Sequence, residues 1–235
     1  MLWKEVNMDK YQEFLSMRIG LDEQFEFKCK CCGKCCEHRY DITLTPIDLH
    51  RIANYYCRDI TDIINRYCNI KNDCQSMMPA ITLKSVGPKE SCPFLLKKKC
   101  IINNVKPSVC AMFPIGRINS LNEGDGIEYV FMNPECGTKG TFQTVREWLS
   151  DMGQLDDYSN VWLEFLADWL SMVTEISNEF KKDKVDEGLF TMSLHELYLN
   201  WDLNQDIYEQ IKQKKKEIPE IRKDIINLVK ICFKK

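Results

Sequence analysis

Cysteine residues give this sequence its clearest chemical signal. The chain has 13 cysteines in 235 residues, and most of them fall between Cys29 and Cys136. Thiolate sulfur is a preferred ligand for zinc and for iron–sulfur clusters, so tight groups of cysteines point to a metal site. Two groups are visible, one within residues 29–36 and the other within residues 92–136.

The first group reads CKCCGKCC and has ligand-like spacing. Two residues separate Cys29 from Cys32, and two separate Cys32 from Cys35, which suits a knuckle around a tetrahedral metal or the start of an iron–sulfur binding run. Gly33 allows a tight turn between the ligands. Because adjacent side chains of an extended stretch point apart, Cys35 and Cys36 either serve two sites or include a spare thiol.

The second group lies among prolines, which stiffen the loops that present the thiols. Cys92 precedes Pro93, Cys110 lies three residues after Pro107, and Cys136 follows Pro134. These spacings match neither a zinc finger nor a common ferredoxin. Together with the first group they form a strong signal for a metal bound by both segments.

The combined pattern resembles the YkgJ-type cysteine-cluster family, which is described as a zinc- or iron-chelating domain. The resemblance covers residues 25–140 and rests on Phe27-x-Cys29-x2-Cys32-Gly33-x-Cys35-Cys36, Thr43-Leu44-Thr45, Asp48, Cys92-Pro93-Phe94-Leu95, Cys100-Ile101, Pro107-x2-Cys110, Phe113-Pro114 and Cys136. The ligands that the resemblance implies are Cys29, Cys32, Cys35, Cys36, Cys92, Cys100, Cys110 and Cys136. This sequence departs from the family in its additional Cys31 and in Ala111, where a basic residue is common.

Eight thiolates suffice for two four-coordinate sites. The cofactor implied is zinc or iron, including a 4Fe–4S cluster, and the sequence does not choose between them because both take soft thiolate ligands. For Cys31, ligation and a spare thiol are equally weighted. The remaining cysteines, Cys57, Cys68, Cys74 and Cys232, are expected to pack in the core. His38 is expected at the surface or beside the site, and His50 and His195 are expected to be ordinary helix residues.

Composition bounds the class of protein. An odd number of cysteines in a chain of this length argues against a secreted disulfide scaffold. The first residues carry no signal-peptide pattern, and no stretch is apolar enough for a membrane helix, so we expect a cytoplasmic protein with no membrane partner. The net charge of −3 gives no case for a nucleic-acid partner.

Helices and short strands must position these thiols. Residues 8–21 and a segment starting near Thr61 are predicted helices, and Thr45-Pro46-x-Asp48 is a helix start with a cap, a first-turn proline and an acidic residue. Residues 80–86 are a predicted strand, and 113–118 with 127–132 a predicted hairpin. The cysteine run, from Phe25 to Ile42, is expected to be a metal-wrapped loop.

From Phe142 onward the pattern predicts helix. An apolar stripe follows Val161, Phe165, Trp169, Val173, Ile176 and Phe180, at spacings typical of one helix face. This stripe is expected to be core, with a protein partner as the alternative. Residues 194–213 are a weaker predicted helix, and Pro219 is expected to open the last one.

The predicted fold is α+β and predominantly helical. A cysteine-cluster metal-binding domain with a small β region is expected over residues 1–140, with a helical extension packed on it over 141–235.

The primary functional hypothesis is a metal-binding protein without turnover. One alternative is an iron–sulfur-dependent enzyme such as a flagellin lysine N-methylase, a description that some relatives carry. The sequence shows no glycine-rich phosphate loop or Ser/His/Asp arrangement to support catalysis. Another alternative is a metal-stabilised interaction module that binds a protein partner through its helical half.

Overall fold

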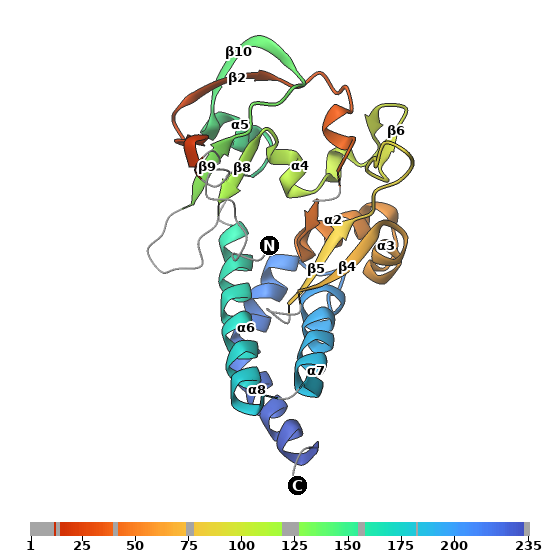
Figure 1. Ribbon diagram of the computed structural model, residues 1–235, viewed down its shortest axis with the longest axis vertical. Helices are drawn as coiled ribbons and strands as arrows, with labels where there is room; N and C mark the ends of the chain where they lie inside the picture. Colours follow the sequence, from red (N-terminus) through yellow and green to blue (C-terminus); the bar gives the residue numbers. More distant parts are fainter. Residues whose placement is uncertain are drawn as a thin grey trace. The chain divides into compact units, whose positions relative to one another are not determined.

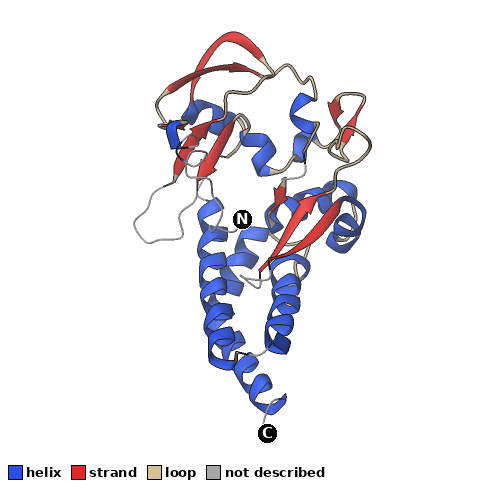
Figure 2. Ribbon diagram, in the orientation of Figure 1, coloured by secondary structure: helices blue, strands red, loops and turns tan. Residues whose placement is uncertain are grey.

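The structure is a computed structural model that describes residues 12, 15–39, 42–73, 78–118, 127–154, 158–181 and 183–232. Its fold is α+β with helix predominating, as the sequence predicts. Figure 2 shows that the strands are short and that the longest elements are helices. No helix among the described residues is both long enough and apolar enough to cross a membrane.

The chain divides into two compact units, and each draws on residues from both sides of position 140. The first unit comprises residues 1–37, 94–101 and 108–156, and the second comprises residues 38–93, 102–107 and 157–235. The predicted division into 1–140 and 141–235 is therefore not the division that the backbone contacts make.

The first unit is built from small antiparallel sheets and two short helices. Its strands are β1 (Arg18–Ile19), β2 (Gln24–Lys28), β6 (Leu95–Leu96), β7 (Lys99–Cys100), β8 (Ile115–Ile118), β9 (Glu128–Phe131) and β10 (Thr138–Thr144), and its helices are α4 (Ser108–Met112) and α5 (Val145–Asp151). β9 lies between β1 and β8, β10 pairs with β2, and β6 pairs with β7. The β8–β9 pairing confirms the predicted hairpin, whose connection, 119–126, lies outside the described residues.

Alternating aromatic residues explain why β2 forms where a loop was expected. Phe25 and Phe27 both point inward and are buried, while their neighbours are more exposed, the period-two pattern of a strand with one face on a core. Both rings lie edge-on to Trp148, at centroid distances of 6.2 and 5.7 Å. The Trp148 indole donates a hydrogen bond of 2.8 Å to the Met112 carbonyl, which ties α5 to α4.

The second unit contains one three-stranded sheet and the long helices. Its elements are β3 (Thr43–Leu44), α2 (Pro46–Tyr56), α3 (Ile60–Tyr67), β4 (Cys68–Asp73), β5 (Met78–Leu83), α6 (Tyr158–Phe180), α7 (Asp183–Leu194), a π-helical turn (His195–Leu199) and α8 (Ile207–Cys232). β5 lies between β3 and β4. α6 runs beside α8 (Figure 1).

Local signals in the second unit are confirmed. Thr45 caps α2 as predicted, and its hydroxyl accepts from the Asp48 backbone while the Asp48 carboxylate accepts from the Thr45 backbone. The predicted helix near Thr61 is α3, and the strand predicted over 80–86 is β5, which ends earlier, at Leu83. Within the apolar stripe, Phe165 and Trp169 are fully buried, so the stripe is core.

Some predicted boundaries are wrong. The helix predicted over 8–21 ends before β1, and most of its other residues lie outside the described part. β10 continues to Thr144, beyond the predicted helix start at Phe142. The helix predicted over 194–213 is interrupted, because the Asp202 carboxylate accepts from the Asn204 backbone in a turn and Asp206 then caps α8.

Pro219 lies inside α8 and does not open a helix. A proline removes one helix hydrogen bond and crowds the preceding turn. Here α8 is tied to α6 on both sides of it, through Lys215 with Glu164 and Arg222 with Glu175. These exposed ion pairs contribute little by themselves. The helix continues through Pro219 because α8 packs along α6, with Ile211 and Ile218 buried.

Candidate metal centre

The Cys29–Cys36 segment folds as a tight double turn directly after β2. The Cys31 backbone amide donates to the Cys29 sulfur at 3.4 Å, and Cys31 and Gly33 have left-handed φ values of 51° and 77°. One turn of 3-10 helix, Lys34–Cys36, follows, and the Cys36 amide donates to the Gly33 carbonyl at 3.0 Å. The segment is thus tightly turned, with amide-to-sulfur donation of the kind that stabilises thiolate; that these turns wrap a metal stays a prediction.

Gly33 also brings the β6–β7 hairpin against this loop. A Cβ atom at Gly33 would lie 2.9 Å from the Lys98 carbonyl oxygen and 3.2 Å from the Lys98 Cα, closer than side chains approach. Cys100 belongs to β7 of the same hairpin, opposite Leu95. The first cysteine loop and the Cys100 hairpin are therefore in backbone contact.

β10 delivers Cys136 to the same loop. Lys28 pairs with Thr138, and the Thr138 hydroxyl donates to the Lys28 carbonyl at 3.5 Å. Gly137 lies so close to β2 that a Cβ atom there would collide with the Phe27 ring. Antiparallel pairing at this register sets Cys136 beside the start of the cysteine loop.

Four sulfurs are close enough to act on one another electrostatically. The pKa of Cys136 is raised, first by burial and then by Cys35, Cys32 and Cys29. The pKa of Cys29 is also raised by burial, against the Cys31 amide hydrogen bond, which lowers it. The Cys35 and Cys36 sulfurs are 4.0 Å apart. Thiolates crowded in this way repel one another, and a cation among them would remove that cost.

Among the described residues, no group of three or more cysteine, histidine or acidic side chains is arranged as it would be around a metal ion. The sulfurs are within electrostatic range but do not form a coordination shell. The donor set itself fits a soft metal, since Cys29, Cys32, Cys35 and Cys136 offer thiolates only. All the cysteines in the described part are thiols, without disulfide bonds.

The other four sequence-predicted ligands are spread over both units. Cys36, Cys100 and Cys110 belong to the first unit and Cys92 to the second. Cys92 is buried, and the other three are half-buried. Each of the four makes a contact with its surroundings. Their participation in a shared metal site stays a prediction.

Outside the motif, the core prediction is confirmed for Cys68 and wrong for Cys57. Cys68 is buried, and burial raises its pKa to about 12. Cys57 is exposed because it ends α2 in a left-handed conformation, with φ 49°. The side chains of Cys74 and Cys232 lie outside the described part.

The three histidines hydrogen-bond to residues outside the cysteine loop. His38 is exposed, and its backbone amide donates to the Lys89 carbonyl. His195 is exposed and bonded to Glu196. His50 is buried, and its Nε2 donates to the Asp202 carbonyl at 3.2 Å, so it fastens α2 to the turn before α8.

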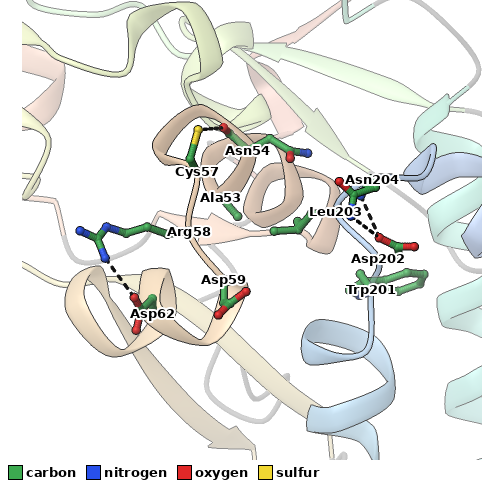
Figure 3. Close-up of a pocket in the computed structure, with 10 residues that line it drawn as sticks. All are labelled: Ala53, Asn54, Cys57, Arg58, Asp59, Asp62, Trp201, Asp202, Leu203 and Asn204. Carbon is green, nitrogen blue, oxygen red and sulfur yellow. Dashed lines mark hydrogen bonds and ion pairs between the residues drawn. The ribbon is translucent and has the colours of Figure 1, made fainter.

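The turn before α8, residues 201–204, forms one wall of a cavity of about 710 Å³ in the second unit (Figure 3). The opposite wall is the end of α2 and the start of α3, where Arg58 pairs with Asp62 at 3.3 Å. The cavity is lined by Ala53, Asn54, Cys57, Arg58, Asp59, Asp62, Trp201, Asp202, Leu203 and Asn204. Sequence reasoning missed it because its walls are far apart in the chain and neither carries a recognisable motif.

Comparison with protein-family models, with curated proteins and with solved structures found no match to this chain.

Proposed function

We propose that this protein binds zinc or iron, including iron in a 4Fe–4S cluster, through clustered cysteine thiolates. The proposed primary ligands are Cys29, Cys32, Cys35 and Cys136. The observation that carries the proposal is that β2–β10 pairing brings Cys136 into electrostatic range of the other three, although 100 residues separate it from the nearest of them in sequence. Four thiols from two segments form the donor set of a structural zinc or cluster site.

The chain's own residues support such a site in three ways. The Cys31 amide donates to the Cys29 sulfur, which favours its thiolate form. Gly33 and Gly137 permit the close backbone approaches on either side. The Phe27 ring, buried behind Gly137, would shield one side of the proposed site from water. A bound metal would cross-link the Cys29–Cys36 loop to Cys136 before β10 and so stabilise the first unit.

Four further thiolates complete the eight that the resemblance implies: Cys36, Cys92, Cys100 and Cys110. We include them as ligands of a second site or as thiols that support the first site. The proposal places the protein in the cytoplasm, where a reducing environment keeps clustered thiols available for metal. A role without turnover is favoured over an enzyme, since the sequence shows no glycine-rich phosphate loop and no Ser/His/Asp arrangement.

Elemental analysis of protein purified without oxygen tests this proposal. We expect zinc or iron in stoichiometric amount, with visible brown colour if the metal is an iron–sulfur cluster. Cys32→Ala should lower metal content and thermal stability together, because it removes a ligand from the first knuckle.

Cys57→Ala is the matched control, since Cys57 is an exposed cysteine outside the motif. It should leave metal content unchanged. A wild-type protein without stoichiometric metal, or an equal loss in both variants, would refute the proposal.

A further inference from the structure

Lysines crowd the segments that build the cysteine loop. Seven of them, called here the lysine collar, are Lys28, Lys30, Lys34, Lys97, Lys98, Lys99 and Lys139. The same stretches, 26–37, 95–100 and 134–140, contain three glutamates and no arginine, which leaves a local net charge of +4. The chain as a whole carries −3, so this basic region stands out against an acidic background.

Two features of the first unit gather the collar. Contact between Gly33 and the backbone of Lys98 sets the β6–β7 turn on the cysteine loop. Pairing of Lys28 with Thr138 brings Lys139 next to β2. Lys97 and Lys98 occupy left-handed conformations, with φ 48° and 65°, so a tight turn presents three consecutive lysines.

The collar ammonium groups have no counter-charge within the described part of the chain. All seven side chains are exposed. Among the residues that the structure describes, none of the seven ammonium groups has an ion-pair or hydrogen-bond partner. Lysines of α8 behave differently: Lys212 pairs with Glu209 at 2.7 Å and Lys215 with Glu164 at 2.7 Å.

Like charges gathered without counter-charges create a positive potential that attracts anionic surfaces over long range. We propose that the lysine collar is a docking surface for a partner protein with an acidic face, which would cover the cysteine loop. This inference goes beyond metal binding and holds whether or not the metal proposal is correct.

The chemistry of lysine favours a protein over a nucleic acid as the partner. Lysine is a compact, hydrated point charge, whereas arginine provides the planar fork that grips phosphates and base edges. A collar of lysines without arginine suits steering and transient docking, in which rim charges set the association rate and its salt dependence.

The test measures binding of a fluorescent oligoglutamate peptide to the full chain by anisotropy. A single-stranded DNA oligonucleotide of equal charge is measured in parallel. We expect the peptide to bind more tightly than the DNA at low salt. Binding should weaken strongly between about 0.01 M and about 0.15 M salt, as the Debye length falls from about 30 to about 8 Å.

Charge-reversal variants distinguish binding at the lysine collar from non-specific attraction by the protein's total charge. Lys97→Glu, Lys98→Glu and Lys99→Glu together should weaken peptide binding about tenfold or more. Reversal of three exposed α8 lysines, Lys216, Lys223 and Lys230, changes the total charge equally and should leave binding within about twofold of wild type.

Lysine acetylation of the wild-type protein keeps the test independent of how the variants fold. The peptide should protect residues 97–99 and leave Lys216 and Lys223 reactive. Equal effects of the two charge reversals, DNA binding as tight as peptide binding, or no protection of residues 97–99 would each overturn the proposal.

Discussion

Replacing Gly137 by alanine should destabilise the first unit far more than the same change at Gly140. Both glycines lie on the Cys136–β10 segment with left-handed φ values, 92° and 96°. Their surroundings differ. A Cβ at Gly137 would collide with the Phe27 ring and lie 3.0 Å from the Lys28 carbonyl oxygen, whereas a Cβ at Gly140 would meet nothing within 4 Å.

The expected magnitudes follow from this difference. Left-handed backbone costs an alanine about 1–2 kcal/mol at either position. At Gly137, forcing a methyl group into a packed contact adds about 1–3 kcal/mol, because Phe27 is buried against Trp148 and cannot swing away. The free energy of unfolding should therefore fall by about 2–5 kcal/mol for Gly137→Ala and by about 1–2 kcal/mol for Gly140→Ala.

Urea unfolding followed by circular dichroism measures both variants, and hydrogen exchange of the β2 peptide locates the effect in the first unit. Metal content provides a second readout, because pushing β10 away from β2 moves Cys136 from the other three thiols. Equal destabilisation by the two alanines would refute the close packing of Gly137 on Phe27. A large loss at Gly137 with unchanged metal content would show that Cys136 is not a ligand.

Three further outcomes are expected in the second unit. Cys57 should react with iodoacetamide in the native protein while Cys68 stays protected. Folding raises the pKa of Cys68 from 9.0 to about 12, so the free energy of unfolding should be constant below pH 9 and fall from there toward pH 12. Cys68→Ala should reduce that fall. Ser193→Ala removes the buried acceptor of the Trp169 indole, 2.9 Å away, and should cost about 1–3 kcal/mol in chemical unfolding, whereas no loss would mean that another acceptor replaces it. Thr45→Ala removes the cap of α2 and should cost about 1 kcal/mol, with earlier hydrogen exchange in that helix as the check.

Local patterns predicted the elements whose causes lie within a few residues. The cap and first-turn proline of α2, the stripe of α6 and the β8–β9 hairpin are all of this kind. The β2 strand has an equally local signal, the alternation of Phe25 and Phe27. It was missed because the adjacent cysteines made the whole segment read as a loop.

Elements decided by distant contacts could not be predicted this way. Pro219 stays helical because α8 packs along α6, with Ile211 and Ile218 buried. The turn at Asp202 is bonded to His50, 152 residues away in sequence. The left-handed end of α2 exposes Cys57, while the sheet buries Cys68. Residue type alone does not separate these two thiols.

The sequence by itself determined which donor groups the chain can offer, since cysteine thiols supply soft sulfur donors in any arrangement. Only the tertiary structure decided which of them come together. The β2–β10 register, held by Gly137 against Phe27, brings Cys136 to Cys29, Cys32 and Cys35. Strand register depends on packing between segments far apart in the chain, whereas spacing patterns describe only near neighbours.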